Sequence, residues 1–64
     1  MIYQNDHPPA HVHVLGPGWA VVVELHTLEV RQNLRASEIQ ARQVARIIAE
    51  HQEPLLHAWR QLHA

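Results

Sequence analysis

The chain of 64 residues contains no cysteine and no lysine. Without cysteine it can form neither a disulfide nor a thiolate zinc site. No apolar run approaches the length of about 18 residues that a membrane-spanning helix needs, and the N-terminal residues do not have the pattern of a signal peptide. We therefore expect a cytoplasmic protein that does not bind membranes.

Size and charge narrow the class of protein further. Apolar residues make up 47% of the sequence, enough for a folded core, and residues 1–64 are expected to form a single small domain. A domain below about 70–80 residues usually needs a disulfide, a metal or a second chain to be stable. Because disulfides are excluded, we expect a protein partner or a homo-oligomer, or histidine-based metal binding. Five arginines against six acidic residues give a net charge of −1, which disfavours nucleic acid as the partner.

The strongest local pattern is a cluster of histidines near the N-terminus. Residues 6–14 read Asp-His-Pro-Pro-Ala-His-Val-His-Val, with three of the chain's seven histidines in nine positions. Imidazole is the commonest metal ligand in proteins and titrates near neutral pH. The cluster therefore indicates a metal site, a proton-transfer site or a contact surface.

Alternation of apolar and polar residues predicts an antiparallel sheet in residues 1–35. Gly16-Pro17-Gly18 and His26-Thr27 are the expected turns of two hairpins. The predicted strands are residues 1–4, 11–15, 19–25 and 28–31, with a loop at 5–9.

The period becomes helical in residues 36–64. Ser37 and Gln40 have the spacing of a capping box, and Pro54 either begins a second helix or kinks the first. The predicted apolar stripe is Ala41, Val44, Ala45, Ile48, Leu55, Trp59 and Leu62. The expected fold is α+β: an antiparallel sheet of three to four strands followed by one kinked helix or two helices, packed on one face.

The strand period of two also assigns faces to the sheet. The residues expected to face the helices are Val12, Val14, Val21, Val23, Leu25, Leu28 and Val30. The residues expected on the opposite face are His11, His13, Ala20, Val22, Glu24, Glu29 and Arg31. Imidazoles and carboxylates from distant positions should therefore meet on that second face.

Residues 5–14 and the pattern that follows resemble the domain-of-unknown-function family 4160, a small bacterial and archaeal family. Its signature is similar to Asp-His-x-Pro-Pro-His-x-His-Val, followed by a strand pair and a helical half that ends near a tryptophan, here Trp59. Family members carry further residues before the motif, so the resemblance implies a shortened first strand and an open sheet edge if Met1 is the natural start. They are often encoded beside a second small protein, as in toxin–antitoxin pairs, which implies a protein partner. The family carries no established activity.

Three functions follow as hypotheses. The first is a non-catalytic interaction module, one component of a toxin–antitoxin-like pair, with Asp6, His7, Trp19 and Arg31 contacting the partner. The second is a divalent-metal protein that binds zinc or nickel through His7, His11, His13 and Glu24.

The third is a small ribonuclease in which His11 and His13 act as general acid and base. Because no nucleophile or phosphate-binding loop accompanies these histidines, we favour a protein that is not an enzyme. On the helix, Glu38 precedes Arg42 by four residues and Arg46 precedes Glu50 by four, which predicts a solvated face with ion pairs.

Overall fold

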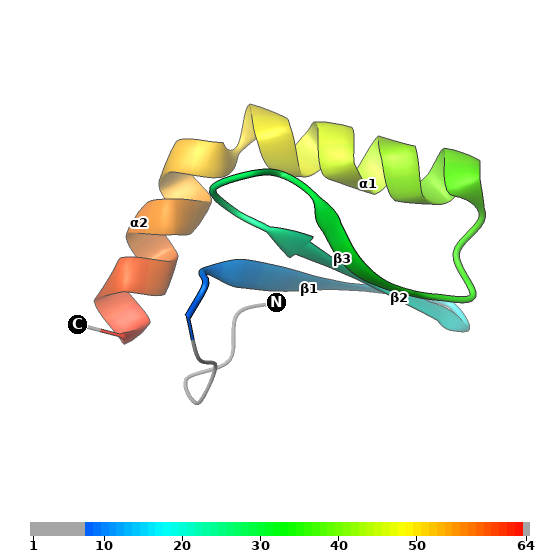
Figure 1. The fold of residues 1–64 in the computed structure, drawn as a ribbon, viewed down its shortest axis with the longest axis horizontal. Coiled ribbons are helices and arrows are strands. Elements are labelled where there is room, and N and C mark those ends of the chain that lie inside the picture. Colours follow the sequence, from blue (N-terminus) through cyan, green and yellow to red (C-terminus); the bar gives the residue numbers. More distant parts are fainter. Residues whose placement is uncertain (1–7, 64) are drawn as a thin grey trace.

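The computed structural model describes residues 8–63 as a three-stranded antiparallel sheet followed by two helices (Figure 1). The predicted α+β class is confirmed, while the predicted strand at residues 1–4 lies outside the described residues. The strands lie in the spatial order β1-β2-β3. The elements are β1 (His11–Gly16), β2 (Trp19–Glu24), β3 (Val30–Leu34), α1 (Glu38–Glu50) and α2 (Gln52–Leu62).

The core lies between one face of the sheet and the two helices. Alternate β-branched residues of β1 and β2 point toward the helices, as the strand period requires. The buried cluster consists of Ala10, Val12, Val21, Val23, Leu25, Val44, Ile48, Leu56 and Trp59. Because α1 and α2 both contribute to this one cluster, the helices cover the same side of the sheet, and Figure 1 shows α1 lying along it.

The first hairpin forms where the sequence predicts it. Gly16 pairs with Trp19, so that Pro17 and Gly18 form the two-residue turn. Gly18 has a φ of 76°, a left-handed conformation that glycine adopts without a steric cost.

The second hairpin differs from the prediction. A tight turn at His26-Thr27 is wrong, because the connection extends from residue 25 to residue 29 and β3 spans Val30–Leu34 rather than 28–31. The loop contains no glycine, and Leu28 supplies the left-handed residue with a φ of 64°. The Leu28 N–H donates to the Glu24 carbonyl at 2.8 Å, and the Glu24 N–H donates to the Glu29 carbonyl at 2.9 Å. The side-chain amide of Gln52 on α2 donates to the Leu25 carbonyl at 2.7 Å and fixes the loop against the helix.

The helical half follows the predicted start signal. The Gln40 N–H donates to the Ser37 hydroxyl at 3.1 Å, and the Ser37 N–H donates to the Gln40 side-chain oxygen at 3.0 Å, which confirms the capping box. Pro54 lies in the first turn of α2, where a missing N–H costs no intrahelical bond. Of the two arrangements open from the sequence, the chain therefore forms two separate helices, which meet at His51.

Two residues assigned to the core are exposed instead. Val30 is 39% exposed and Leu62 is 46% exposed. Val30 begins the edge strand directly after the long loop, and Leu62 is the last residue of α2, so each lies at the end of its element. The other stripe residues agree better with the prediction: Ala41, Val44, Ile48 and Trp59 are buried, and Leu55 packs against the core.

Candidate functional site

The side of the sheet away from the helices brings four of the predicted site residues together: His11, His13, Glu24 and Arg31. We call this side the outer face, defined by the side chains of His11, His13, Leu15, Ala20, Val22, Glu24, Gln32 and Leu34, together with Arg31. The register pairs His11 with Glu24 and His13 with Val22. Residues far apart in the sequence therefore become direct neighbours on one surface, as predicted.

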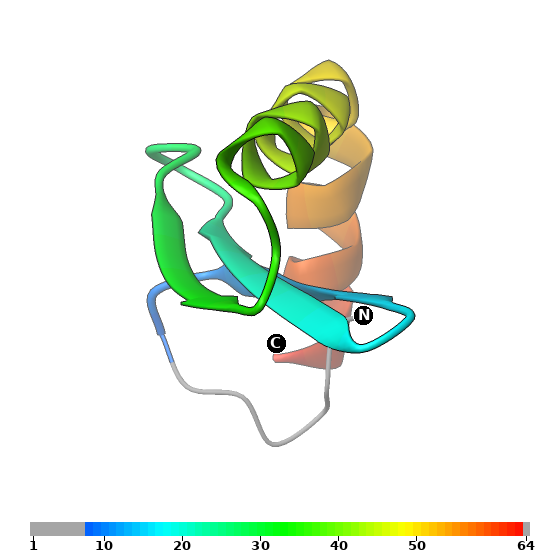
Figure 2. The ribbon, with the colours of Figure 1, turned by 90° about the vertical axis from the view of Figure 1, so that its right-hand side faces the viewer.

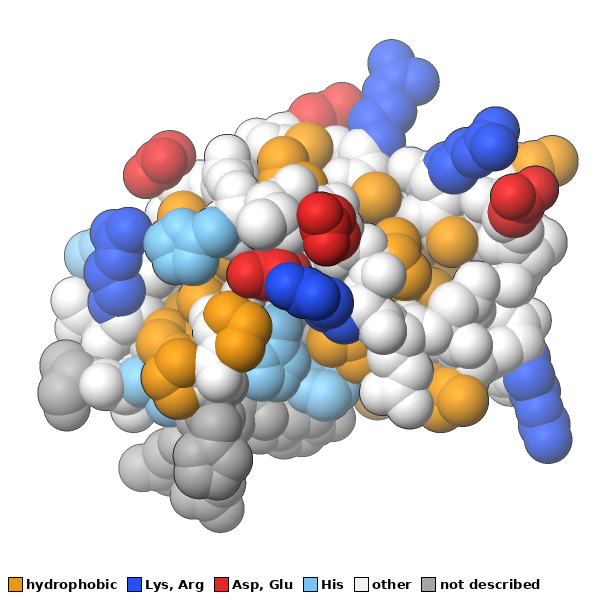
Figure 3. All heavy atoms as spheres, in the orientation of Figure 1, with side chains coloured by type: hydrophobic (Ala, Val, Ile, Leu, Met, Phe, Trp, Pro, Cys, Tyr) orange, Lys and Arg blue, Asp and Glu red, His pale blue; other side chains and the backbone are white. Residues whose placement is uncertain are grey.

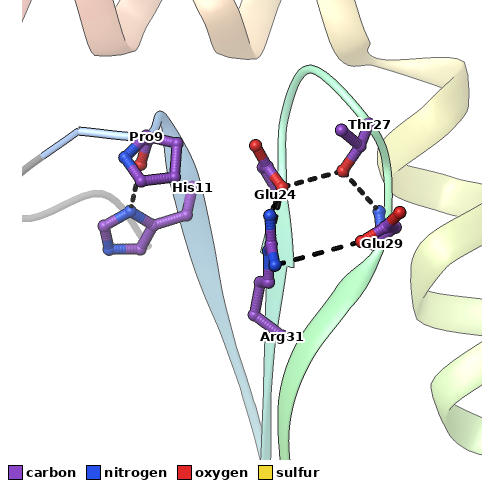
Figure 4. Close-up of polar contacts among 6 residues, drawn as sticks. All are labelled: Pro9, His11, Glu24, Thr27, Glu29 and Arg31. Carbon is purple, nitrogen blue, oxygen red and sulfur yellow. Dashed lines mark hydrogen bonds and ion pairs between the residues drawn. The ribbon is translucent and has the colours of Figure 1, made fainter.

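The two histidines of β1 are close neighbours. Their ring centroids are 5.1 Å apart and the rings are tilted by 60°. The Nδ1 atom of His11 lies 2.7 Å from the Pro9 carbonyl oxygen, which fixes the orientation of that ring (Figure 4). In the space-filling view, histidine side chains gather beside a cluster of arginine and acidic side chains (Figure 3).

Glu24 is the only charged residue buried in the described part of the chain. Its Oε2 atom accepts a hydrogen bond from the Thr27 hydroxyl at 2.9 Å and one from Arg31 Nε at 2.8 Å (Figure 4). The Arg31 Nη2 atom also donates to Oε2, and Arg31 Nη1 lies 4.0 Å from a carboxylate oxygen of Glu29. The hydrogen bond from Thr27, followed by that from Arg31, lowers the pKa of Glu24 below its usual value.

A β-bulge places Arg31 on the outer face. The β2–β3 register runs from Ala20 opposite Leu34 to Val22 opposite Gln32, and then shifts so that Val23 lies opposite Val30. Arg31 is the extra residue, and such a residue turns out of the regular alternation. The sequence predicts the position of Arg31, but it does not indicate the bulge or the part played by Thr27.

The arrangement around Glu24 does not favour metal binding there. Oε2 already accepts three hydrogen bonds, and the adjacent guanidinium repels a second cation. Within residues 8–63 no group of three or more histidine, cysteine or acidic side chains is placed to hold a metal ion. Asp6 and His7 lie outside the described residues, so the four-ligand site that includes His7 stays a prediction.

A hollow lies at the opposite end of the sheet from Glu24. It has a volume of about 380 Å³ and is lined by Gly18, Trp19, Ala20, Leu34 and Arg35. The Trp19 indole lies against Gly16, the residue opposite it on β1, at a position where a β-carbon would collide with the ring. Gly16 thus leaves room for the Trp19 indole. Trp19 is partly buried, packs against the core and also lines the hollow.

An apolar row on the outer face leads to this hollow. Leu15, Ala20 and Leu34 are direct neighbours across the three strands. Leu15 is 58% exposed and Leu34 is also exposed. Neither leucine is among the residues that the sequence predicts to contact a partner. Their alternation with inward-facing residues is a usable signal, but an isolated exposed leucine is too common to identify a site.

The arginines of α1 differ from the prediction. Neither Glu38–Arg42 nor Arg46–Glu50 forms an ion pair. The ion pairs among the described residues are Arg31–Glu24 and Arg31–Glu29. The side chains of the two α1 pairs are exposed, and an ion pair between exposed groups gains little over solvation by water.

The described residues define a small α+β domain in which two helices cover one face of a three-stranded antiparallel sheet. The chain belongs to the family described as Domain of unknown function (DUF4160), whose model matches residues 1–60. No curated protein and no solved structure matches the chain. Neither of the helices in residues 8–63 is long and apolar enough to cross a bilayer.

Proposed function

We propose that this protein is a non-catalytic interaction module that binds a partner protein through the outer face of its sheet, as one component of a toxin–antitoxin-like pair. The observation that carries the proposal is the apolar row Leu15–Ala20–Leu34, in which both leucines are exposed and which runs into the hollow lined by Trp19. Within the described residues, both helices lie on the other side of the sheet.

The chemistry of the row and hollow fits a protein partner. Apolar contact area next to a tryptophan and an arginine is the composition of an interface hot spot. Arg35 at the rim of the hollow forms no ion pair within residues 8–63. An apolar side chain of the partner, with an acidic residue near it, would complement this end of the surface.

The polar end of the outer face favours recognition over catalysis. The Arg31 guanidinium is held by Glu24, so its charge is largely neutralised and it is a poor ligand for a substrate phosphate. A fixed ion pair beside His11 and His13 supplies directional hydrogen-bonding groups at a contact surface. Ribonuclease activity and metal binding by the histidines therefore rank below protein binding.

The test uses the product of the neighbouring gene as the partner. Its binding to the purified chain is measured by titration calorimetry for the parent, for Leu15→Gln and for Ile47→Gln. The two substitutions are matched, because Leu15 and Ile47 are 58% and 56% exposed but lie on β1 and α1 respectively.

We expect Leu15→Gln to weaken binding at least about tenfold, and Ile47→Gln to leave it within about twofold of the parent. No binding by the parent, or equal losses in the two variants, would contradict the proposal.

A further inference from the structure

We infer that the hollow at the end of the sheet binds the C-terminal residue of the partner protein, whose apolar side chain enters the hollow while its α-carboxylate binds the Arg35 guanidinium. The inference rests on the proposed function and names the part of the partner that this site takes. The hollow lies where the start of β2 meets the end of β3, because Ala20 is paired with Leu34. Figure 2 looks onto this end of the molecule, with the β1–β2 turn and the connection from β3 to α1 nearest to the viewer.

The hollow is apolar and small. Trp19, Ala20 and Leu34 supply its apolar surface, and its volume is about 380 Å³. This volume is near the lower end of the range of roughly 300–1,000 Å³ that is usual for ligand sites. The hollow therefore suits the side chain of one residue, such as leucine, rather than a helix or a strand of the partner.

Arg35 is a cation at the edge of the hollow. Its side chain is exposed, and the ion pairs formed within residues 8–63 are those of Arg31. The Arg35 guanidinium can therefore donate two parallel hydrogen bonds to a carboxylate of another molecule. Arg31 is not equivalent, because its guanidinium is already bonded to Glu24.

The turn that carries Arg35 is fixed by its neighbours. The Ala36 N–H donates to the Asn33 side-chain oxygen at 2.9 Å, and the Asn33 side-chain amide donates to the Ala36 carbonyl at 3.1 Å. Arg35 lies between these two residues with a φ of 68°, a left-handed conformation that glycine adopts without a steric cost. An arginine where the backbone favours glycine supports a function of the side chain at this position.

The size of the hollow favours a C-terminal residue over an internal acidic one. The proposed function asks for an apolar side chain of the partner with an acidic group near it. In a C-terminal residue the carboxylate and the side chain are attached to the same Cα, so a single residue can fill the hollow and reach Arg35. An aspartate or glutamate would have to come from a second residue, in a chain that continues past the hollow in both directions.

The first experiment needs no partner protein. The Trp19 indole N–H is followed by nuclear magnetic resonance while three peptides are added: acetyl-Gly-Gly-Leu with a free carboxylate, the same peptide as its C-terminal amide, and the amide of acetyl-Gly-Leu-Asp. The second peptide lacks the charge, and the third carries it on an acidic side chain. The parent is compared with Arg35→Gln and with Arg46→Gln, a matched control because Arg46 is an exposed arginine of α1 that does not line the hollow.

We expect the free acid to bind the parent and Arg46→Gln at least about tenfold more tightly than either amide. In Arg35→Gln this advantage should fall to within about twofold. Circular dichroism checks that both variants are folded. No binding of the free acid, equal binding of the free acid and its amide, an equal loss in the two variants, or tighter binding of the aspartyl peptide would each overturn the inference.

The second experiment separates this inference from the proposed function. The product of the neighbouring gene is extended at its C-terminus by Gly-Ser-Gly-Ser, which moves the carboxylate away from its last natural residue. In the matched control, the same extension is placed at its N-terminus. Titration calorimetry with the parent chain should show binding at least about tenfold weaker for the C-terminal extension, and within about twofold of the unmodified product for the N-terminal one.

The two proposals fail in different ways. If the C-terminal extension binds like the unmodified product while Leu15→Gln still weakens binding, the inference is wrong and the proposed function stands. If the unmodified product does not bind while the three peptides behave as expected, the proposed function is wrong and the hollow remains a site for the C-terminus of another protein.

Discussion

Glu24 and Arg31 are seven positions apart in the sequence and are joined side by side on the outer face, because one is buried at the end of β2 and the other is the bulged residue of β3. The ion pair closes the polar end of the sheet, next to His11. The Glu24 carboxylate, which the sequence predicts as a metal ligand, instead stabilises the second hairpin.

The first prediction concerns the coupling of this pair. Arg31→Ala leaves the buried Glu24 carboxylate without its cation, and we expect it to destabilise the fold more than the double variant Glu24→Gln/Arg31→Ala, which removes the buried charge as well. Urea unfolding of the parent, both single variants and the double variant measures the coupling. Additive effects of the two substitutions would show that the pair contributes nothing beyond its separate residues.

The second prediction concerns acid stability. Because the pKa of Glu24 is lowered in the folded protein, the contribution of Glu24 to the free energy of unfolding is complete above the ordinary glutamate pKa of about 4.5. That contribution is lost as the pH falls through the lower folded pKa. Thr27→Val removes the hydrogen bond that lowers the pKa most, so stability should fall less steeply between about pH 5 and pH 2 than in the parent. Thr27→Ser keeps the hydroxyl and should follow the parent in acid unfolding monitored by circular dichroism.

The third prediction uses the two glycines of the first hairpin. A β-carbon at Gly16 collides with the Trp19 indole, so Gly16→Ala should displace the ring and destabilise the fold by about 1–3 kcal/mol. At Gly18 a β-carbon meets open space, but the φ of 76° makes Gly18→Ala cost about 1–2 kcal/mol in the backbone alone. Tryptophan fluorescence should therefore change in the first variant and stay constant in the second. A constant spectrum in both would contradict the described position of Trp19.

The fourth prediction concerns Arg35, which has a left-handed φ of 68° between β3 and α1. Arg35→Gly relieves this conformation and should stabilise the protein by up to about 1 kcal/mol, because glycine adopts it without strain. The same change at Arg46, in the middle of α1, should destabilise by about 1 kcal/mol. Thermal unfolding of the two variants gives opposite shifts if the backbone assignment is correct.

Sequence patterns predict the fold where one local rule acts alone. Alternation defines β1 and β2, the Gly16-Pro17-Gly18 turn sets the first hairpin, and the Ser37–Gln40 capping box sets the start of α1. The second hairpin escapes prediction because its left-handed residue is Leu28, which has no intrinsic preference for that conformation. Its loop is stabilised by tertiary contacts instead, through Thr27 to Glu24 and Gln52 to the Leu25 carbonyl.

Part of the candidate site is likewise predicted by the sequence, and part of it is not. The face shared by His11, His13 and Glu24 follows from the strand period alone. The hollow does not, because it depends on Trp19 lying against Gly16 and on Leu34, a residue that enters the strand only once the loop is placed correctly. Because the predicted strand ends three residues before the observed end of β3, the sequence does not predict this part of the proposed binding surface.

The most direct test of the central claim is a nuclear magnetic resonance titration of the labelled chain with the neighbouring gene's product. The account predicts chemical-shift changes concentrated on Leu15, Ala20 and the Trp19 indole, with Ile39 and Ile47 on the exposed side of α1 unchanged. Changes concentrated on α1, or none at saturating partner, would contradict the assignment of the outer face as the binding surface.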